Sequence, residues 1–262
     1  MPVRPRKRFG QHFLTDEQVL DAIVRAVGPG RDDQMLEIGP GRGALTQLLC
    51  GEVDTLHAIE LDRDLIASLR TRFENLQLSQ GDVLAIDFPE RLRSGGWRLV
   101  GNLPYNLSSP LLLKLVQFPD LIRDMHFMLQ KEMAERMAAQ PGSKAWGRLS
   151  VMLQLSFQIE SLFDVEPAAF HPPPKVMSQV VRLVPLPAGE RPGRQLEDEA
   201  QLRRVVAAAF GQRRKTLNNS LKAWSFDFSD FGLEGRQRAE ELTVQQFIAL
   251  ANDATARGIM GQ

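Results

Sequence analysis

The chain has little of the residue types that most often build metal sites or disulfide frameworks. Its 262 residues include one cysteine and four histidines. A single cysteine, Cys50, cannot form an intramolecular disulfide, and beside Leu48 and Leu49 it is expected to pack in a helix. The histidines show no ligand spacing, so we expect no metal; they are His12, His57, His126 and His171.

Long apolar runs are also missing. No stretch of the sequence is long enough to span a bilayer. The polar, arginine-rich first residues lack the apolar segment of a secretory signal. We therefore expect a cytoplasmic protein that neither spans nor binds a membrane.

The chain has no excess of charge, since 32 basic residues balance 32 acidic ones. A neutral chain argues against nucleic-acid binding, but the charges are unevenly distributed. Residues 1–12 and residues 202–224 hold basic side chains and no acid. A solvated terminus and a solvated helix face are the simpler explanations. The basic residues are Arg4, Arg6, Lys7, Arg8, Arg203, Arg204, Arg213, Arg214, Lys215 and Lys222.

What the chain does have is a glycine-rich turn between an apolar strand and a helix. Residues 35–38 are mostly apolar, and glycines follow at 39, 41 and 43. Bare backbone there lets a ligand approach the peptide groups. Glu60 follows about twenty residues later, where such sheets present a carboxylate to ribose hydroxyls. The pattern predicts a nucleoside-binding crevice for an NAD-like or adenosylmethionine-like cofactor, with a purely structural turn as the alternative.

The fold class follows from alternating strands and helices. A helix with a Thr15–Gln18 capping box is expected to end at Gly28, and strand-helix alternation predicts a Rossmann-like α/β sheet, mostly parallel and antiparallel at one end. A boundary rich in proline and glycine over 185–193 separates a domain at 1–187 from a small all-α domain at 188–262. The expected strands are 35–38, 55–59, 76–78, 97–100 and 124–130, with 153–163 and 177–186 as an antiparallel closing pair.

The segment 101–110, after the fourth expected strand, carries the most specific chemistry. An exocyclic amine is a poor nucleophile because its lone pair is delocalised into the base. The Asn102 side-chain oxygen and a carbonyl near Leu103, held by the ring of Pro104, can accept both amine hydrogens and favour a tetrahedral nitrogen. Tyr105, the only tyrosine, can stack on the base. An ordinary asparagine-proline turn with a packing tyrosine is the alternative.

Three further candidates lie at the ends of expected elements. Asp82 is placed to accept from an adenine amine, or else simply forms a turn. Phe170 precedes three prolines in residues 172–174, which fix it at low entropic cost, and a hydrophobic anchor is its simplest role. Lys144 lies in a loop that can touch RNA.

Four segments together resemble the ribosomal RNA adenine N6,N6-dimethyltransferase family, closest to its bacterial small-subunit enzymes. They are Gly-Gln-His-Phe-Leu (10–14), Glu-Ile-Gly-Pro-Gly-Arg-Gly (37–43), Asn-Leu-Pro-Tyr-Asn (102–106) and Phe-His-Pro-Pro-Pro-Lys-Val (170–176). The likeness spans nearly the whole chain. It implies S-adenosylmethionine as the cofactor and dimethylation of two adjacent adenines near the 3′ end of 16S ribosomal RNA, with a role in subunit maturation.

The resemblance also implies roles for individual residues. The cofactor is expected on His12, Leu14, Gly39, Glu60, Asp82 and Asn102. Asn102, Leu103, Pro104, Tyr105 and Phe170 are expected to hold the target adenine. Small-subunit RNA in the 30S particle is expected on Arg6, Lys7, Arg8, Lys144, Arg213, Arg214 and Lys215, and we expect the protein to be a monomer.

The sequence departs from the family pattern at three positions. His12 and Gly211 stand where relatives usually have Asn, and Asn218 stands where they usually have Arg. Rival functions are methylation of large-subunit RNA or of DNA adenine, an NAD-dependent oxidoreductase, and a catalytically silent RNA-binding assembly factor. DNA enzymes usually have proline where Leu103 stands, and an oxidoreductase leaves residues 102–105 unexplained.

Overall fold

A computed structural model describes residues 12–259 of the chain. Its contacts divide the chain into two compact units. The first ends at Ala134 and resumes over Ile159–Pro185, and the second comprises Glu135–Gln158 and the residues from Leu186 onward. The chain therefore passes between the units three times, and the last crossing lies two residues before the domain boundary that the sequence predicts.

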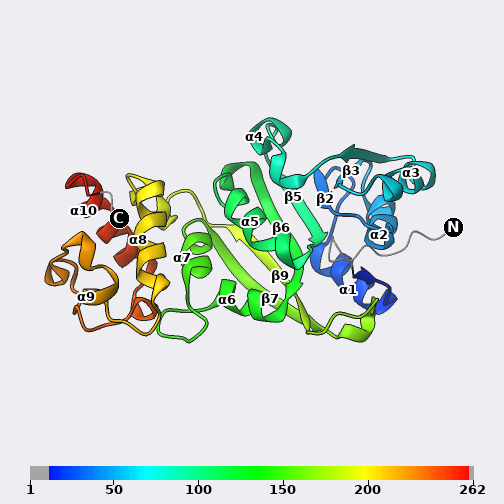
Figure 1. Ribbon diagram of the computed structural model, residues 1–262. Helices are drawn as coiled ribbons and strands as arrows, with labels where there is room; N and C mark the ends of the chain where they lie inside the picture. Colours follow the sequence, from blue (N-terminus) through cyan, green and yellow to red (C-terminus); the bar gives the residue numbers. More distant parts are fainter. Residues whose placement is uncertain (1–11, 260–262) are drawn as a thin grey trace. The chain divides into compact units, whose positions relative to one another are not determined.

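The first unit is built on a seven-stranded sheet with the order β4-β3-β2-β5-β6-β9-β7. The first five of these strands are parallel neighbours, and β9 pairs antiparallel with β6, as the sequence predicts. Figure 1 shows β2, β5, β6 and β9 side by side. The strands are β2 (Met35–Ile38), β3 (Leu56–Glu60), β4 (Leu76–Gln80), β5 (Trp97–Asn102), β6 (Ile122–Gln130), β7 (Phe157–Val165) and β9 (Ser178–Pro185).

Helices connect and cover these strands because each presents an apolar face to the sheet. In α1, for example, Leu20, Ile23 and Val27 are buried, each contributing roughly 1.5–3 kcal/mol to stability. The helices of this unit are α1 (Glu17–Val27), α2 (Ala44–Glu52), α3 (Arg63–Arg72), α4 (Phe88–Arg91) and α5 (Tyr105–Leu115), with the short 3-10 helix η2 (Val83–Ala85) after β4; α6 (Lys131–Ala138) crosses into the second unit.

Two local predictions were wrong. The cap of α1 is Asp16 rather than Thr15, since the Asp16 carboxylate accepts from the amides of Gln18 and Val19, whereas the Thr15 hydroxyl donates to the Ala169 carbonyl. Residues 153–163 do not form one strand. The helix α7 (Arg148–Gln154) occupies the start of that range, and β7 begins only at Phe157, because an apolar run of this length fits either structure.

The second unit is helical from Leu186 onward within the described residues, as the sequence predicts. Its longest helices, α8 (Glu199–Gly211) and α10 (Val244–Ala256), pack on each other through buried side chains that include Val205 and Phe247. The short helix α9 (Leu217–Ser220) follows α8. None of the described helices is long and apolar enough to cross a membrane.

Candidate functional site

The glycine-rich turn after β2 is held by Glu60, at the end of the neighbouring strand β3. The Glu60 carboxylate accepts from the Gly41 amide at 3.1 Å and from the Asp62 amide at 2.8 Å. Burial raises the pKa of Glu60, although these amide hydrogen bonds oppose the rise. The carboxylate is thus fixed beside bare backbone, where ribose hydroxyls can reach its remaining lone pairs.

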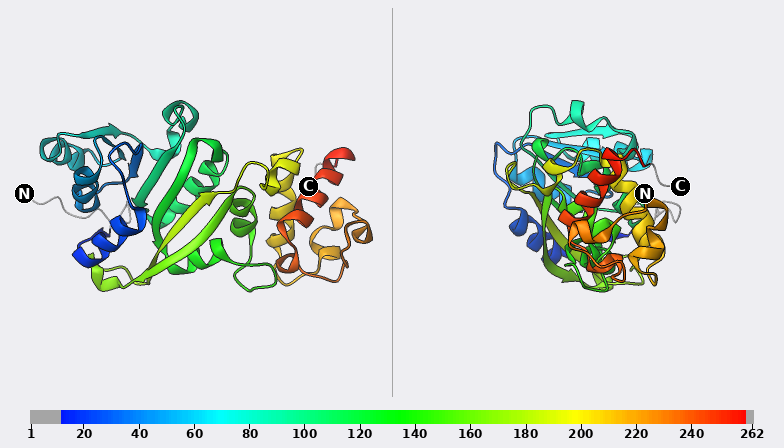
Figure 2. Two further views of the ribbon diagram at one scale, coloured as in Figure 1. Left: turned by 180° about the vertical axis from the view of Figure 1, so that it is seen from behind. Right: turned by 90° about the vertical axis from the view of Figure 1, so that its left-hand side faces the viewer.

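A short strand from the N-terminal segment covers this turn. β1 (Phe13–Leu14) pairs antiparallel with β8 (Phe170–His171), which places Leu14 opposite Phe170. Figures 1 and 2 both show the dark-blue start of the chain beside the yellow-green segment that contains β8. The positive φ of Gly41 and its position under the Phe13 ring, which a Cβ would approach at 3.2 Å, explain the glycine there.

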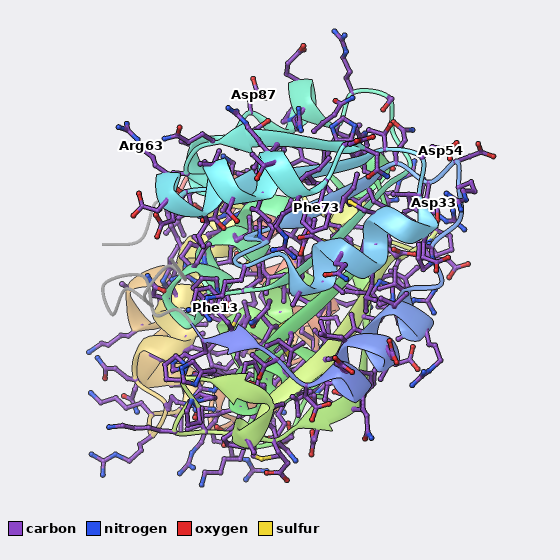
Figure 3. All side chains as sticks on the ribbon, turned by 90° about the vertical axis from the view of Figure 1, so that its right-hand side faces the viewer. Phe13, Asp33, Asp54, Arg63, Phe73 and Asp87 are labelled. Carbon is purple, nitrogen blue, oxygen red and sulfur yellow. The ribbon has the colours of Figure 1, made fainter. Side chains whose placement is uncertain are left out.

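The position of Phe13 also shows at which end of the sheet β1 lies. The Arg42 guanidinium stacks over the Phe13 ring at 4.5 Å, next to the turn that follows β2. Asp33 precedes β2, and Figure 3 shows Phe13 and Asp33 well apart, on opposite sides of that view. The short strand therefore sits at the carboxyl ends of the parallel strands, where open α/β sheets bind ligands.

Asn102 ends β5 and is oriented by the same N-terminal segment. Its amide nitrogen donates to the His12 carbonyl at 3.0 Å, so the Oδ1 atom remains as the acceptor. His12 is held in turn, because its Nδ1 lies 2.7 Å from the Pro172 carbonyl oxygen. The sequence predicted that Asn102 accepts hydrogen bonds. It could not show that a backbone carbonyl 90 residues away would fix the orientation of its side chain.

The residue before Asn102 must be small. A Cβ on Gly101 would lie 2.5 Å from the Ile38 carbonyl oxygen of the neighbouring strand. Glycine at 101 therefore lets β2 and β5 approach closely beneath the site.

Most of the predicted site residues line one cavity of about 340 Å³ within the first unit. Asp82 lies on the side of the cavity formed after β4. The Asp82 carboxylate accepts from the Leu84 amide at 2.9 Å. Phe170 lines the cavity but is 4% exposed and packs in the apolar cluster with Leu14. The lining includes His12, Leu14, Gly39, Glu60, Asp82, Asn102, Leu103, Pro104 and Phe170.

For some predicted site residues, the described part of the structure gives no side-chain position. Tyr105 begins α5, and its side chain lies outside the described part of the structure. Arg6, Lys7 and Arg8 precede the first described residue. Among the described residues, no group of His, Cys, Asp and Glu side chains is arranged to hold a metal ion.

Glu37 lines the cavity, although sequence reasoning gave it no role in the site. It is 2% exposed, and the Thr46 hydroxyl donates to its Oε2 atom at 2.7 Å. Burial, with a smaller contribution from the charge of Glu60, raises the pKa of Glu37 to about 7, while the Thr46 hydrogen bond opposes the rise. A lone acid inside an otherwise apolar strand was the available signal.

The second unit brings together two basic segments that are distant in sequence. The exposed Arg213 guanidinium donates to the carbonyls of Lys144 at 2.7 Å and Trp146 at 3.2 Å. Lys144, Arg214 and Lys215 are exposed as well. Arg213 therefore holds the Lys144 loop beside its own basic segment, residues 213–215.

The same chemistry appears in known proteins. A family model described as ribosomal RNA adenine dimethylase matches residues 3–255. The chain belongs to the ribosomal RNA adenine dimethylase family. It is 52% identical over 259 residues to a protein of Bordetella avium named "Ribosomal RNA small subunit methyltransferase A", with 97% of each chain covered. The resemblance stated from the four sequence segments is thereby confirmed.

Solved structures of this kind share the dimethylase fold. A dimethyladenosine transferase from Plasmodium falciparum has a TM-score of 0.76 at 26% identity, covering 95% of this chain and 99% of its own. A 23S rRNA methyltransferase, ErmE, has a TM-score of 0.68 at 25% identity, covering 92% and 98%. Identity is thus about twice as high to the small-subunit relative as to the large-subunit one.

Proposed function

We propose that this protein is an S-adenosylmethionine-dependent enzyme that dimethylates the exocyclic amines of two adjacent adenines near the 3′ end of 16S ribosomal RNA. It acts in the cytoplasm as a monomer on the 30S particle and contributes to subunit maturation. The observation that carries the proposal is the orientation of Asn102 at the wall of the cavity. Its amide nitrogen donates to the His12 carbonyl, which leaves Oδ1 as the acceptor.

The cavity residues fit the cofactor. Glu60, fixed by two backbone amides, suits the ribose hydroxyls. Asp82 retains acceptor capacity for the adenine amine, and the Gly39 turn offers close backbone approach. When bound, S-adenosylmethionine supplies an activated methyl group.

The chain's own contribution is to position and polarise the target amine. Asn102 Oδ1 and a backbone carbonyl near Leu103 accept its two hydrogens, which draws the lone pair out of the base. Once the nitrogen carries a methyl group its proton becomes acidic and leaves to solvent, so no strong base is needed. We propose that Tyr105 and Phe170 pack on the base after it leaves its stack, at a cost of a few kcal/mol.

The second unit, which includes the predicted helical domain at 188–262 and the Lys144 loop, is proposed to bind RNA. Exposed Lys144, Arg214 and Lys215 can neutralise phosphates, each contact releasing counterions. Arg213 contributes through the loop that it holds. Arg6, Lys7 and Arg8 are proposed to add contacts from the N-terminal arm.

Methyl incorporation tests this function. Labelled S-adenosylmethionine is supplied with unmethylated small subunits, naked small-subunit RNA or naked large-subunit RNA, and the product is digested to nucleosides. We expect dimethyladenosine from small subunits. Asn102→Ala should reduce transfer at least 100-fold with little change in cofactor affinity, whereas Gln117→Ala, an exposed position after α5, should match the wild type.

Other outcomes would select a rival. Label confined to large-subunit RNA would move the protein to the large-subunit branch. Absence of label from every substrate, with normal RNA binding, would support a silent assembly factor. Full activity of Asn102→Ala would refute the amine-polarising role.

A further inference from the structure

Beneath the site, one row of residues crosses three neighbouring strands. Glu37 of β2 is opposite Val100 of β5, and Val100 is opposite His126 of β6. Residues opposite each other in a sheet point to the same face. Glu37 and His126 both line the cavity, and Val100, which lies between them in the row, is buried.

His126 is held from behind by a buried ion pair. Its Nδ1 lies 3.5 Å from Asp124 Oδ1, and Asp124 accepts from Arg98 Nη2 at 2.9 Å. Burial would raise the pKa of Asp124, but the His126 imidazole and the Arg98 guanidinium hold it below its usual value. Arg98 also donates to the Val27 and Gly28 carbonyls at the end of α1 and to the Asp33 carboxylate. Asp124 and Arg98 are therefore held in place from several sides.

The Asp124 carboxylate favours one tautomer of His126. A carboxylate beside Nδ1 favours the tautomer with its proton on Nδ1, which leaves Nε2 as an acceptor. Nε2 of this cavity-lining residue therefore carries a lone pair.

Within residues 12–259, that lone pair has no hydrogen-bond partner. The His126 side chain is 0% exposed, and neither Nε2 nor Nδ1 makes a hydrogen bond, although Nδ1 lies 3.5 Å from Asp124 Oδ1. Burying a polar atom without a partner destabilises the folded protein, so native structures seldom leave one unpaired. In a residue that lines a ligand cavity, the natural partner is a donor on the ligand.

The order of the strands indicates which part of the cofactor reaches this atom. Along the sheet edge, Asp82 follows β4, Glu60 ends β3, Gly39 follows β2 and Asn102 ends β5. With adenine at Asp82 and ribose at Glu60, the amino-acid end falls at β5 and β6. His126 lies two residues before Met128, the residue opposite Asn102, and therefore roughly 6.6 Å deeper than the edge. The target base enters from the edge, so the deeper atom meets the cofactor.

We infer that His126 is a cofactor-binding residue whose Nε2 accepts a hydrogen bond from the α-ammonium group of S-adenosylmethionine. Glu37, from the same row, lies on the other side of Val100. Asp124 and Arg98 are positioning residues that keep the lone pair of His126 directed at the cavity. This assignment rests on the proposed function.

Calorimetric binding of three ligands tests the inference without relying on activity. They are S-adenosylhomocysteine, its deaminated analogue that keeps the carboxylate, and 5′-methylthioadenosine, which lacks the amino-acid part. His126→Phe should weaken S-adenosylhomocysteine roughly tenfold and leave the other two unchanged. His126→Gln, which retains an acceptor, should recover part of the loss, and Met125→Leu, a buried position on the same strand that does not line the cavity, should leave all three within about twofold.

The outcomes separate the inference from the proposed function. Equal losses for all three ligands in His126→Phe, or no loss for any, would overturn the role of His126. Wild-type protein that binds none of the three would refute the proposed cofactor and the inference with it. Should His126→Phe not fold, the ring-nitrogen NMR signal of His126 in wild-type protein decides: it should shift on adding S-adenosylhomocysteine and stay in place with the deaminated analogue.

Discussion

The two units use charged side chains in opposite ways. In the first, Arg98, Asp124 and Glu37 are almost fully buried and each has a specific partner. In the second, Arg214 and Lys215 are exposed. Buried charges cost several kcal/mol to desolvate and act only in one geometry, whereas exposed charges cost little and act through the ion atmosphere. Substitutions in the first unit should therefore change stability or one binding step, and those in the second should change the salt dependence of RNA binding.

The largest effect is expected at Arg98. Arg98→Leu leaves the carboxylates of Asp33 and Asp124 without their main partner, and should lower the free energy of unfolding by about 3–5 kcal/mol. Urea denaturation measures it. Arg123→Leu removes a cation that also contacts Asp33 but is 60% exposed, and should cost less than about 1 kcal/mol. Equal losses in the two variants would contradict the contrast between buried and exposed charge.

Glu37 should make stability depend on pH. Its folded pKa of about 7 exceeds the ordinary 4.5, so the folded state holds the proton more tightly than the unfolded state. Its favourable contribution is fully present below pH 4.5 and is lost as pH rises to about 7. Glu37→Gln should remove this slope and be about 1–3 kcal/mol more stable than wild type at pH 8. Denaturation curves of both proteins at pH values from 5 to 8 measure the effect. If the free energy of unfolding changed with pH equally in wild type and Glu37→Gln, the Glu37 carboxylate would not be the cause.

The exposed basic cluster should act through salt. Replacing Arg214 and Lys215 with Gln should leave the free energy of unfolding within about 0.5 kcal/mol and reduce the slope of log K against log salt by roughly 1.4–1.8. RNA binding at several salt concentrations measures this slope. Arg194→Gln with Arg236→Gln removes the same charge from exposed positions elsewhere in the unit, and an identical reduction there would mean that only net charge matters.

The smallest effect concerns Cys50. Burial, with the charge of Glu37, raises the pKa of its thiol to about 11, so about a thousandth is thiolate at pH 8. A disulfide reagent should therefore react far more slowly with the folded protein than with the same protein in urea. Similar rates in both states would show that the helix does not shield the thiol.

Local patterns predicted much of the sheet and the cavity because both depend on short segments. The glycine turn, Glu60 and Asn102 could be placed because parallel strands bring their carboxyl ends to one edge. Residues 153–163 were misassigned since an apolar run suits a helix or a strand equally well. His126 could not be recognised, because its role depends on Asp124, Arg98 and the neighbouring strands together.

The sequence by itself determined the fold class and the family, because periodicity and short motifs encode local conformation directly. Only the tertiary structure decided that the His12 carbonyl orients the Asn102 side chain, that Arg213 holds the Lys144 loop, and that His126 lies beside Asp124 and lines the cavity. These contacts join residues that are distant along the chain, and no local pattern specifies which distant atoms meet when the core packs.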